Sequence, residues 1–265
     1  MSDPLISATA PPSTSAPSPS SEDPKRKGLL FAGTERGVFV SFDDGNNWQS
    51  LALNIPVTSM RDIQVYQNDL IVATHGRGFW VIDDITPLRQ IDASVLSSDV
   101  YLFKPADTVD MIPTDDNGTP LQKDEPHAEN PPNGVAIDYY LKTAGDPVTL
   151  EILDSTGKVI KTFSTNPSQE PPRRTRGGAG SGLPRVSPLW QTTPDRFSGA
   201  AGMHRVVWEP LIPPPPRAAG AQGGFGGDPG TRVNGTFTAR LTTNGKSLTQ
   251  TFSVAPDPRS HVTSE

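Results

Sequence analysis

Two stretches of the chain share one pattern of apolar and polar positions. In residues 29–40, apolar side chains alternate with small or polar ones on both sides of a turn that contains glycine. The same pattern recurs in residues 70–81, so that Leu29 and Leu70 are 41 residues apart. Alternation around a glycine turn predicts two β-strands joined as a hairpin. A period of about 40 to 45 residues is typical of one four-stranded propeller blade. Residues 28–90 are therefore predicted to form about two blades of a β-propeller.

Two blades cannot close a ring, and a blade normally buries its faces against neighbouring blades. We therefore expect the apolar faces of these strands to lack a neighbouring blade on at least one side. The segment should then pack against the sandwich, self-associate or recruit another propeller chain, and we expect an oligomeric or aggregation-prone chain. The apolar positions concerned are Leu29, Phe31, Val38, Val40, Leu70, Val72, Phe79 and Val81.

The second half of the chain shows a different pattern. Short stretches of alternating β-branched and aromatic residues, separated by turn residues, predict an immunoglobulin-like or fibronectin-like sandwich over residues 135–257. A linker and a first sandwich strand are expected within 91–134, and long loops rich in proline and glycine at 165–188 and 210–233. The predicted fold class is all-β. The expected strands span residues 100–104, 135–142, 148–154, 158–164, 203–208, 236–242 and 247–254.

The two ends of the sequence carry no such pattern. Residues 1–27 are rich in serine and proline, which predicts a disordered tail, and 258–265 are expected to form a second one. No apolar run reaches the roughly 18 residues of a membrane-spanning helix. No signal peptide is visible, so the sequence leaves the compartment open.

Composition narrows the classes of function. The net charge of −6 provides no basic field for a phosphate backbone, which excludes nucleic acid as the expected partner. The absence of cysteine excludes disulfides and thiolate chemistry. The four histidines show no ligand spacing, so neither a metal nor a cofactor is expected.

One octapeptide points to a specific structure. Residues 41–48 match the Asp-box pattern Ser-x-Asp-x-Gly-x-x-Trp through Ser41, Asp43, Gly45 and Trp48. Asp43 is expected to accept hydrogen bonds from turn amides, Gly45 to supply a positive φ, and Trp48 to pack as an apolar plug. The motif names an architecture and not a reaction.

Together with this motif, residues 29–48, 73–84, 130–141 and 148–154 resemble the C-terminal end of large bacterial proteins with sortilin-like and glycosyl-hydrolase-like Asp-box (BNR-type) propellers. The resemblance implies an exported protein with an immunoglobulin-like C-terminal domain. It carries no catalytic residue onto this chain, since the carboxyl pair that glycosidases need would come from other blades.

Arg36, His75 and Arg77 are the candidate ligand-binding residues. Arg36 and Arg77 occupy equivalent positions of the repeat, where they could bind a carboxylate or a sugar hydroxyl. The alternative is that they bond carbonyls or carboxylates of the neighbouring blade.

Two functions follow as alternatives. The first is a noncatalytic module that binds a carbohydrate or a protein, or that serves in assembly. The second is part of a glycoside hydrolase whose catalytic blades lie upstream. The sequence leaves open whether the chain takes part in catalysis.

Overall fold

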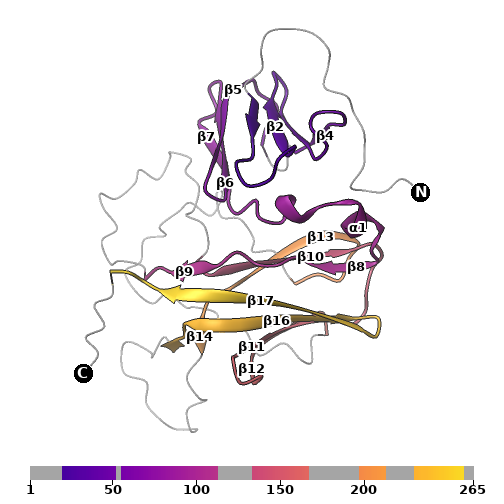
Figure 1. The fold of residues 1–265 in the computed structure, drawn as a ribbon, viewed down its shortest axis with the longest axis vertical. Helices are drawn as coiled ribbons and strands as arrows, with labels where there is room; N and C mark the ends of the chain where they lie inside the picture. The colour runs from indigo at the N-terminus through magenta and orange to yellow at the C-terminus, as the bar shows by residue number, and fades with distance from the viewer. Residues whose placement is uncertain (1–19, 52–54, 113–132, 167–196, 213–229, 260–265) are drawn as a thin grey trace, which may run out of the picture. The chain divides into compact units, whose positions relative to one another are not determined.

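The fold was obtained as a computed structural model, which describes residues 20–51, 55–112, 133–166, 197–212 and 230–259 (Figure 1). These residues are predominantly β-strand, as predicted for the fold class. They fall into two compact units, Met1–Tyr101 and Leu102–Glu265. The parts predicted to be loops at 165–188 and 210–233 lie mostly outside the described residues, as do 1–19 and 260–265.

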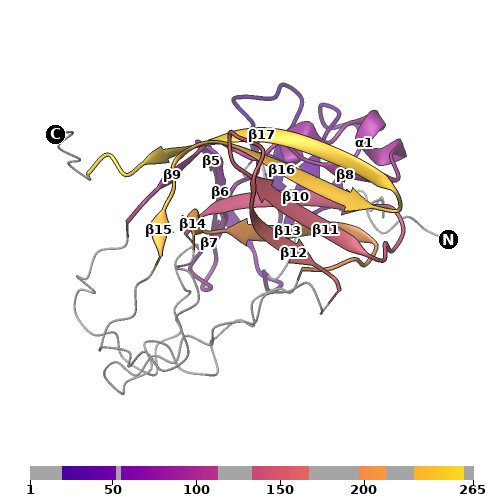
Figure 2. The ribbon, with the colours of Figure 1, turned by 90° about the horizontal axis from the view of Figure 1, so that it is seen from below.

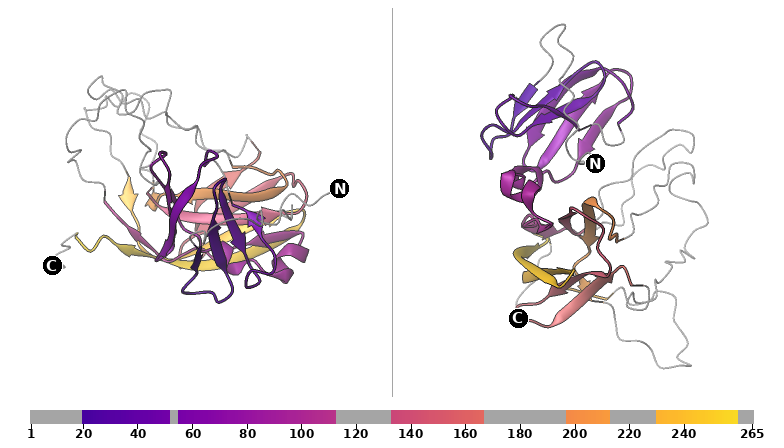
Figure 3. Two further views of the ribbon diagram at one scale, coloured as in Figure 1. Left: turned by 90° about the horizontal axis from the view of Figure 1, so that it is seen from above. Right: turned by 90° about the vertical axis from the view of Figure 1, so that its right-hand side faces the viewer.

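The first sheet of the N-terminal unit is a four-stranded antiparallel meander. Its strands follow the chain order, so each is joined to its neighbour by a turn. Figure 3 shows this sheet from two directions. The strands are β1 (Ser20–Glu22), β2 (Leu30–Gly33), β3 (Val38–Ser41) and β4 (Gln49–Ser50).

The second sheet of this unit has three antiparallel strands in chain order. A short 3-10 helix and one α-helix follow it. Asp92 caps the α-helix, because its carboxylate accepts hydrogen bonds from the amides of Ser94 and Val95. The elements are β5 (Met60–Tyr66), β6 (Asp69–Thr74), β7 (Phe79–Ile82), η1 (Leu88–Gln90) and α1 (Ala93–Ser97).

The two sheets of the N-terminal unit share one hydrophobic core. Six of the eight apolar positions expected to lack a neighbour are instead buried in it: Leu29, Phe31, Val38, Val40, Leu70 and Val72. The two sheets cover each other, so the expectation that these side chains lack a neighbour on one side is wrong for the six positions. Phe79 and Val81, both on β7, are the exceptions, with exposed fractions of 79% and 49%.

A shift of register explains why β7 differs from β3. In the first hairpin Phe31 lies opposite Val40, whereas in the second Val72 lies opposite Trp80 and not Val81. A shift of one residue exchanges the two faces of a strand. Trp80 and Ile82 therefore pack against the core, while Phe79 and Val81 point outward.

The disordered tail was predicted to end at residue 27, but the ordered structure begins earlier, at Ser20. Ser20–Glu22 form β1 against β2, and Asp23 is only 2% exposed. The amides of Lys25 and Arg26 donate to the Asp23 carboxylate, at 2.7 and 2.8 Å. This serine-rich segment is ordered because its backbone pairs with β2 and because the buried Asp23 carboxylate accepts hydrogen bonds from the residues that follow. Amino-acid composition alone does not indicate either interaction.

The C-terminal unit contains two main sheets (Figure 2). The five-stranded sheet has the order β12-β11-β16-β17-β9, and the three-stranded sheet the order β13-β10-β8. Strand β8 spans the boundary between the two units, since its last residue is the first of the C-terminal unit. All seven strands predicted for the sandwich are present. They are β8 (Val100–Leu102), β10 (Val135–Leu141), β11 (Val148–Leu153), β12 (Val159–Ser164), β13 (Gly202–Trp208), β16 (Gly235–Thr243) and β17 (Lys246–Pro256).

Three short strands of this unit were not predicted. The first, β9 (Thr108–Asp110), runs parallel to β17 at the sheet edge, although its residues were expected to be linker. The others, β14 (Leu211–Ile212) and β15 (Thr231–Arg232), pair with each other. They lie at the two ends of the predicted loop 210–233, so that loop begins and ends as a two-stranded ribbon.

An aromatic cluster joins the two sheets of the C-terminal unit. Trp208 of β13 is 2% exposed and lies edge-on to Phe237 of β16, with ring centroids 4.9 Å apart. Phe252 of β17 is 6.0 Å from both rings. Edge-to-face packing at these distances is favourable beyond the burial of area. The cluster therefore holds the three-stranded and the five-stranded sheet in contact.

Tyr139 of β10 is a buried phenol of this unit. Its hydroxyl donates to the carbonyl of Ser198 at 2.6 Å, and its ring lies 5.5 Å from that of Phe197. Burial raises the pKa of Tyr139 to about 12. The folded protein therefore keeps this proton at pH values where the unfolded chain loses it.

We expect this difference to make stability fall with pH in a defined window. Between pH about 10 and about 12 the unfolded chain binds fewer protons at this position, so the free energy of unfolding drops by up to about 1.4 kcal/mol per pH unit. Urea titrations of the wild type and of Tyr139→Phe at several pH values in this window test it. The variant should show a shallower decline, and an equal decline in both proteins would contradict the assignment to Tyr139.

Candidate functional site

The turns of the two repeated hairpins lie at the same end of the N-terminal unit. Each begins at a threonine: the Thr34 amide donates to the carbonyl of Gly37 at 2.9 Å, and the Thr74 amide to that of Gly78 at 3.1 Å. The hydroxyls of both threonines donate to the same two carbonyls. The two hairpins are therefore closed by the same hydrogen-bond pattern.

The segment that leads into β5 joins these two turns. The amide of Met60 donates to the carbonyl of Thr34 at 2.8 Å, and the carbonyl of Ser59 accepts from the amide of His75 at 2.8 Å. The Thr58 hydroxyl donates to the carbonyl of His75 at 3.0 Å. Residues 34–37, 58–61 and 74–78 thus form one continuous surface, which we call the tip end.

All three predicted ligand-binding residues lie at the tip end. Arg36 is on the first turn, and His75 and Arg77 are on the second; all are exposed. Arg61, which the sequence analysis did not select, adds a third guanidinium directly after Met60. It interrupts the regular pairing of β5 with β6, where the register shifts between Met60 and Asp62.

The tip arginines differ from the others in the described part of the chain. Arg36, Arg61 and Arg77 have no side-chain hydrogen bond or ion pair with any described residue. The alternative in which Arg36 and Arg77 bond the neighbouring sheet is therefore not observed among these residues. Every other described arginine has a partner: Arg26 with Leu88, Arg89 with Asp23, Arg205 with Asp138, Arg232 with Asp110, Arg240 with Glu151, and Arg259 with Asp257.

Two carboxylates accompany these cations. Glu35 is exposed on the first turn, and Asp62 follows Arg61 on β5. The Asp62 carboxylate accepts a hydrogen bond from the amide of Ile63 at 2.9 Å. Three permanent positive charges against two negative ones make the tip end locally cationic in a chain whose net charge is −6.

The Ser41–Trp48 turn lies at the opposite end of the same sheet, between β3 and β4. The Asp43 carboxylate accepts from the amide of Asn47 at 2.8 Å and from the Ser41 hydroxyl at 2.9 Å. Bonds from Asn47 hold the pKa of Asp43 below its ordinary value. With these bonds, the Asp43 carboxylate ties the turn to the end of β3.

Glycine is required in this turn. Gly45 has a φ of +85°, and the Trp48 indole lies 3.7 Å from the position that a Cβ would take. Trp48 itself is half-buried. The indole packs over Gly45 and stays partly exposed to solvent.

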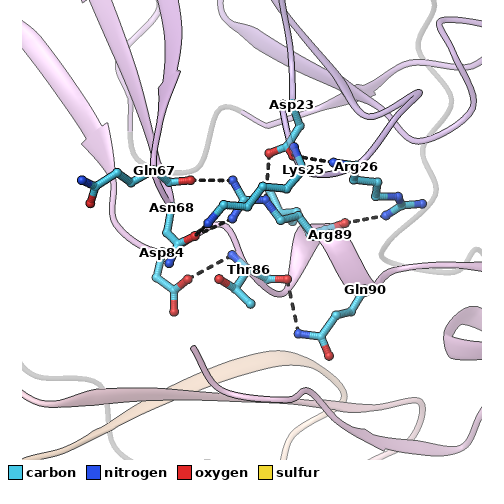
Figure 4. Close-up of polar contacts among 10 residues, drawn as sticks. Asp23, Lys25, Arg26, Gln67, Asn68, Asp84, Thr86, Arg89 and Gln90 are labelled. Carbon is cyan, nitrogen blue, oxygen red and sulfur yellow. Dashed lines mark hydrogen bonds and ion pairs between the residues drawn. The ribbon is translucent and has the colours of Figure 1, made fainter. Parts of the chain in front are cut away.

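A buried ion pair ties the two sheets together near this turn (Figure 4). The Arg89 guanidinium of η1 donates to the Asp23 carboxylate at 2.8 Å, to Asn68 Oδ1 at 2.6 Å and to the carbonyl of Gln67 at 2.8 Å. The side chains of Arg89 and Asp23 are 9% and 0% exposed. Lys25 also donates to Asn68 Oδ1. Because these groups satisfy one another, we assign the cluster a structural role.

The described residues contain neither a cluster of metal-ligating side chains nor a membrane-spanning helix. Among them, no group of three His, Cys, Asp or Glu side chains could hold a metal ion. Within the same residues, no helix has the length and apolarity to cross a bilayer.

Fold and site together define an all-β protein with a cationic tip on its N-terminal unit. Neither the protein-family models nor the curated proteins compared with the chain match it.

Proposed function

We propose that this chain is a noncatalytic part of an Asp-box propeller protein of the sortilin-like and glycosyl-hydrolase-like kind. In this proposal the tip end binds a ligand that carries carboxylates, either a carbohydrate or a protein. One observation carries the proposal: Arg36 and Arg77 lie on the two hairpin turns and Arg61 lies at the start of β5, where the chain is hydrogen-bonded to both turns. None of the three has a side-chain partner among the described residues, whereas the other described arginines are paired.

Two features support the kinship. The Ser41–Trp48 turn uses its serine, aspartate and glycine as an Asp box would, and it joins the third and fourth strands of a four-stranded meander. Such a meander is the unit of a propeller blade. The two-layered C-terminal unit suits an immunoglobulin-like domain.

The chemistry of the tip end suits binding. An arginine side chain presents a planar fork of donors that matches a carboxylate in a bidentate arrangement. These guanidinium groups are exposed, so they give up no partner among the described residues when a ligand binds. His75 adds a ring nitrogen that can donate to a hydroxyl or a carboxylate.

Isothermal titration of the full chain with polygalacturonate and with polyglutamate tests this function, with neutral dextran as the uncharged comparison. We expect binding to one of the two polyanions that weakens with added salt. Replacement of Arg36, Arg61 or Arg77 by glutamine, one at a time, should weaken it about tenfold or more, since a hydrogen bond to a charged group contributes about 1.5 to 3 kcal/mol.

Arg240→Gln is the matched control, because it removes the same charge from the C-terminal unit, where Arg240 pairs with Glu151. It should leave the affinity unchanged. The proposal fails if the three tip variants bind as the wild type does, or if Arg240→Gln weakens binding equally.

A further inference from the structure

Strand β7, the edge of the second sheet, is free of the protection that edge strands usually carry. Its sequence is Phe79-Trp80-Val81-Ile82, without a charged residue or a proline. Among the described residues, no strand pairs with its other side. Open edges without charges readily pair with another strand. In the first sheet, by contrast, β4 covers the corresponding side of β3.

The pairing pattern shows which backbone groups of β7 face the open side. In the first hairpin Thr34 and Gly37 form a hydrogen-bonded pair. Hydrogen-bonded and non-hydrogen-bonded pairs alternate along antiparallel strands, so the next pair, Gly33 and Val38, is not hydrogen-bonded. The backbone amide and carbonyl of Val38 therefore point away from β2. The amide of Leu51 indeed donates to the carbonyl of Val38 at 2.8 Å. In the second hairpin Thr74 bonds Gly78 in the same way. By the same alternation, the amides and carbonyls of Phe79 and Val81 point away from β6.

The same two residues carry the exposed apolar side chains of the strand. Phe79 is 79% exposed and Val81 is 49% exposed. Backbone groups without a partner in the described part of the chain and exposed apolar side chains thus occur on the same alternate residues of one short strand. A second strand that paired here would satisfy the backbone and bury both side chains.

We propose that the occupant of this edge is β7 of a second copy of the chain, paired antiparallel about a two-fold axis perpendicular to the sheet. Such an axis keeps the outward faces of both copies on one side. Phe79 then lies opposite Val81 of the second copy, and the reverse pair forms by symmetry. Both pairs exchange two hydrogen bonds, because the residues concerned already point outward. Trp80 lies opposite its own counterpart.

The strand fits itself for two reasons. Phe79 and Val81, whose backbone groups point outward, are two residues apart, so antiparallel pairing places each of them opposite the other in the second copy. The facing side chains are apolar on both copies, so no charge is buried. Because one pair of short strands buries little area, we expect a weak dimer with a dissociation constant in the micromolar range.

Register-specific cross-linking tests the geometry. The chain has no cysteine, so singly substituted Phe79→Cys and Val81→Cys chains can link only between copies. In the proposed pairing their Cα atoms are about 5.5 Å apart, within the range that a disulfide spans. A mixture of the two should form the mixed dimer much faster than Phe79→Cys alone forms its own dimer. Equal rates would overturn the proposal.

Sedimentation velocity of the full chain over a range of concentrations tests the association itself. The wild type should pass from monomer to dimer, and Val81→Lys should weaken the dimer about tenfold or more. Val57→Lys is the control, since Val57 is 80% exposed but lies outside the strands. A wild type that stays monomeric throughout, or a Val81→Lys variant that dimerises as well as the control, would overturn the proposal.

Discussion

Replacement of Arg89 by alanine is expected to lower the free energy of unfolding of the N-terminal unit by about 3 to 5 kcal/mol. The substitution leaves the Asp23 carboxylate buried without its counter-ion, and it removes the donors to Asn68 and to the carbonyl of Gln67. These contacts join the turn after β1, the β5–β6 turn and η1 (Figure 4). Native-state hydrogen exchange of the amides of β2 and β6 measures the loss.

The double variant Asp23→Asn with Arg89→Met is the matched control. It removes both charges, so we expect it to be more stable than Arg89→Ala, since the largest cost comes from the unpaired buried charge. Arg89→Lys should be intermediate, because one ammonium cannot reproduce the planar fork of donors. If Arg89→Ala exchanges its amides as slowly as the wild type, the ion pair does not hold the two sheets together.

Replacement of Trp208 by alanine is expected to destabilise the C-terminal unit by about 3 to 5 kcal/mol. Trp208 is 2% exposed and fills the space between the two sheets against Phe237 and Phe252. The substitution removes the indole and leaves a cavity where the layers meet. Urea titration followed by circular dichroism measures the loss as a lower unfolding midpoint.

Trp208→Phe should cost less than Trp208→Ala, since it retains an aromatic ring against Phe237. Val159→Ala serves as the control at an exposed position, because Val159 is 38% exposed. It should change stability by no more than about 0.5 kcal/mol. An alanine variant of Trp208 with the same midpoint as the Val159 variant would show that the two sheets do not depend on this cluster.

Alternation of apolar and polar residues was sufficient to predict most strands. The 41-residue repeat marks hairpins that share one turn pattern, and the seven stretches predicted for the sandwich all contain strands. Alternation works here because one face of each strand is buried and the period of two fixes which residues it holds. The short helix α1 was not predicted, although an aspartate such as Asp92, directly before the first helical residue, is a typical capping signal.

Contacts between distant segments could not be predicted in this way. Nothing around Asp23 or Arg89 indicates that they meet, because 66 residues separate them and the bond depends on how two sheets pack. Arg61 was missed for the same reason, since its place beside the two turns depends on the bond between Met60 and Thr34. The register shift of β7 also escaped prediction, as the repeat implied that Phe79 would lie on the same face as its counterparts in the first hairpin.

The parallel pairing of β9 with β17 has a consequence for biosynthesis. Thr108 lies beside Val254, and the amide of Ile112 donates to the carboxylate of Asp257, 145 residues later in the chain. During synthesis β9 therefore leaves the ribosome long before its partner strand, β17, has been made. The β16–β17 hairpin, whose strands are joined by a tight turn at Asn244 and Gly245, closes locally and at low entropic cost. The edge of the nascent sheet thus stays open until its last long strand has been made.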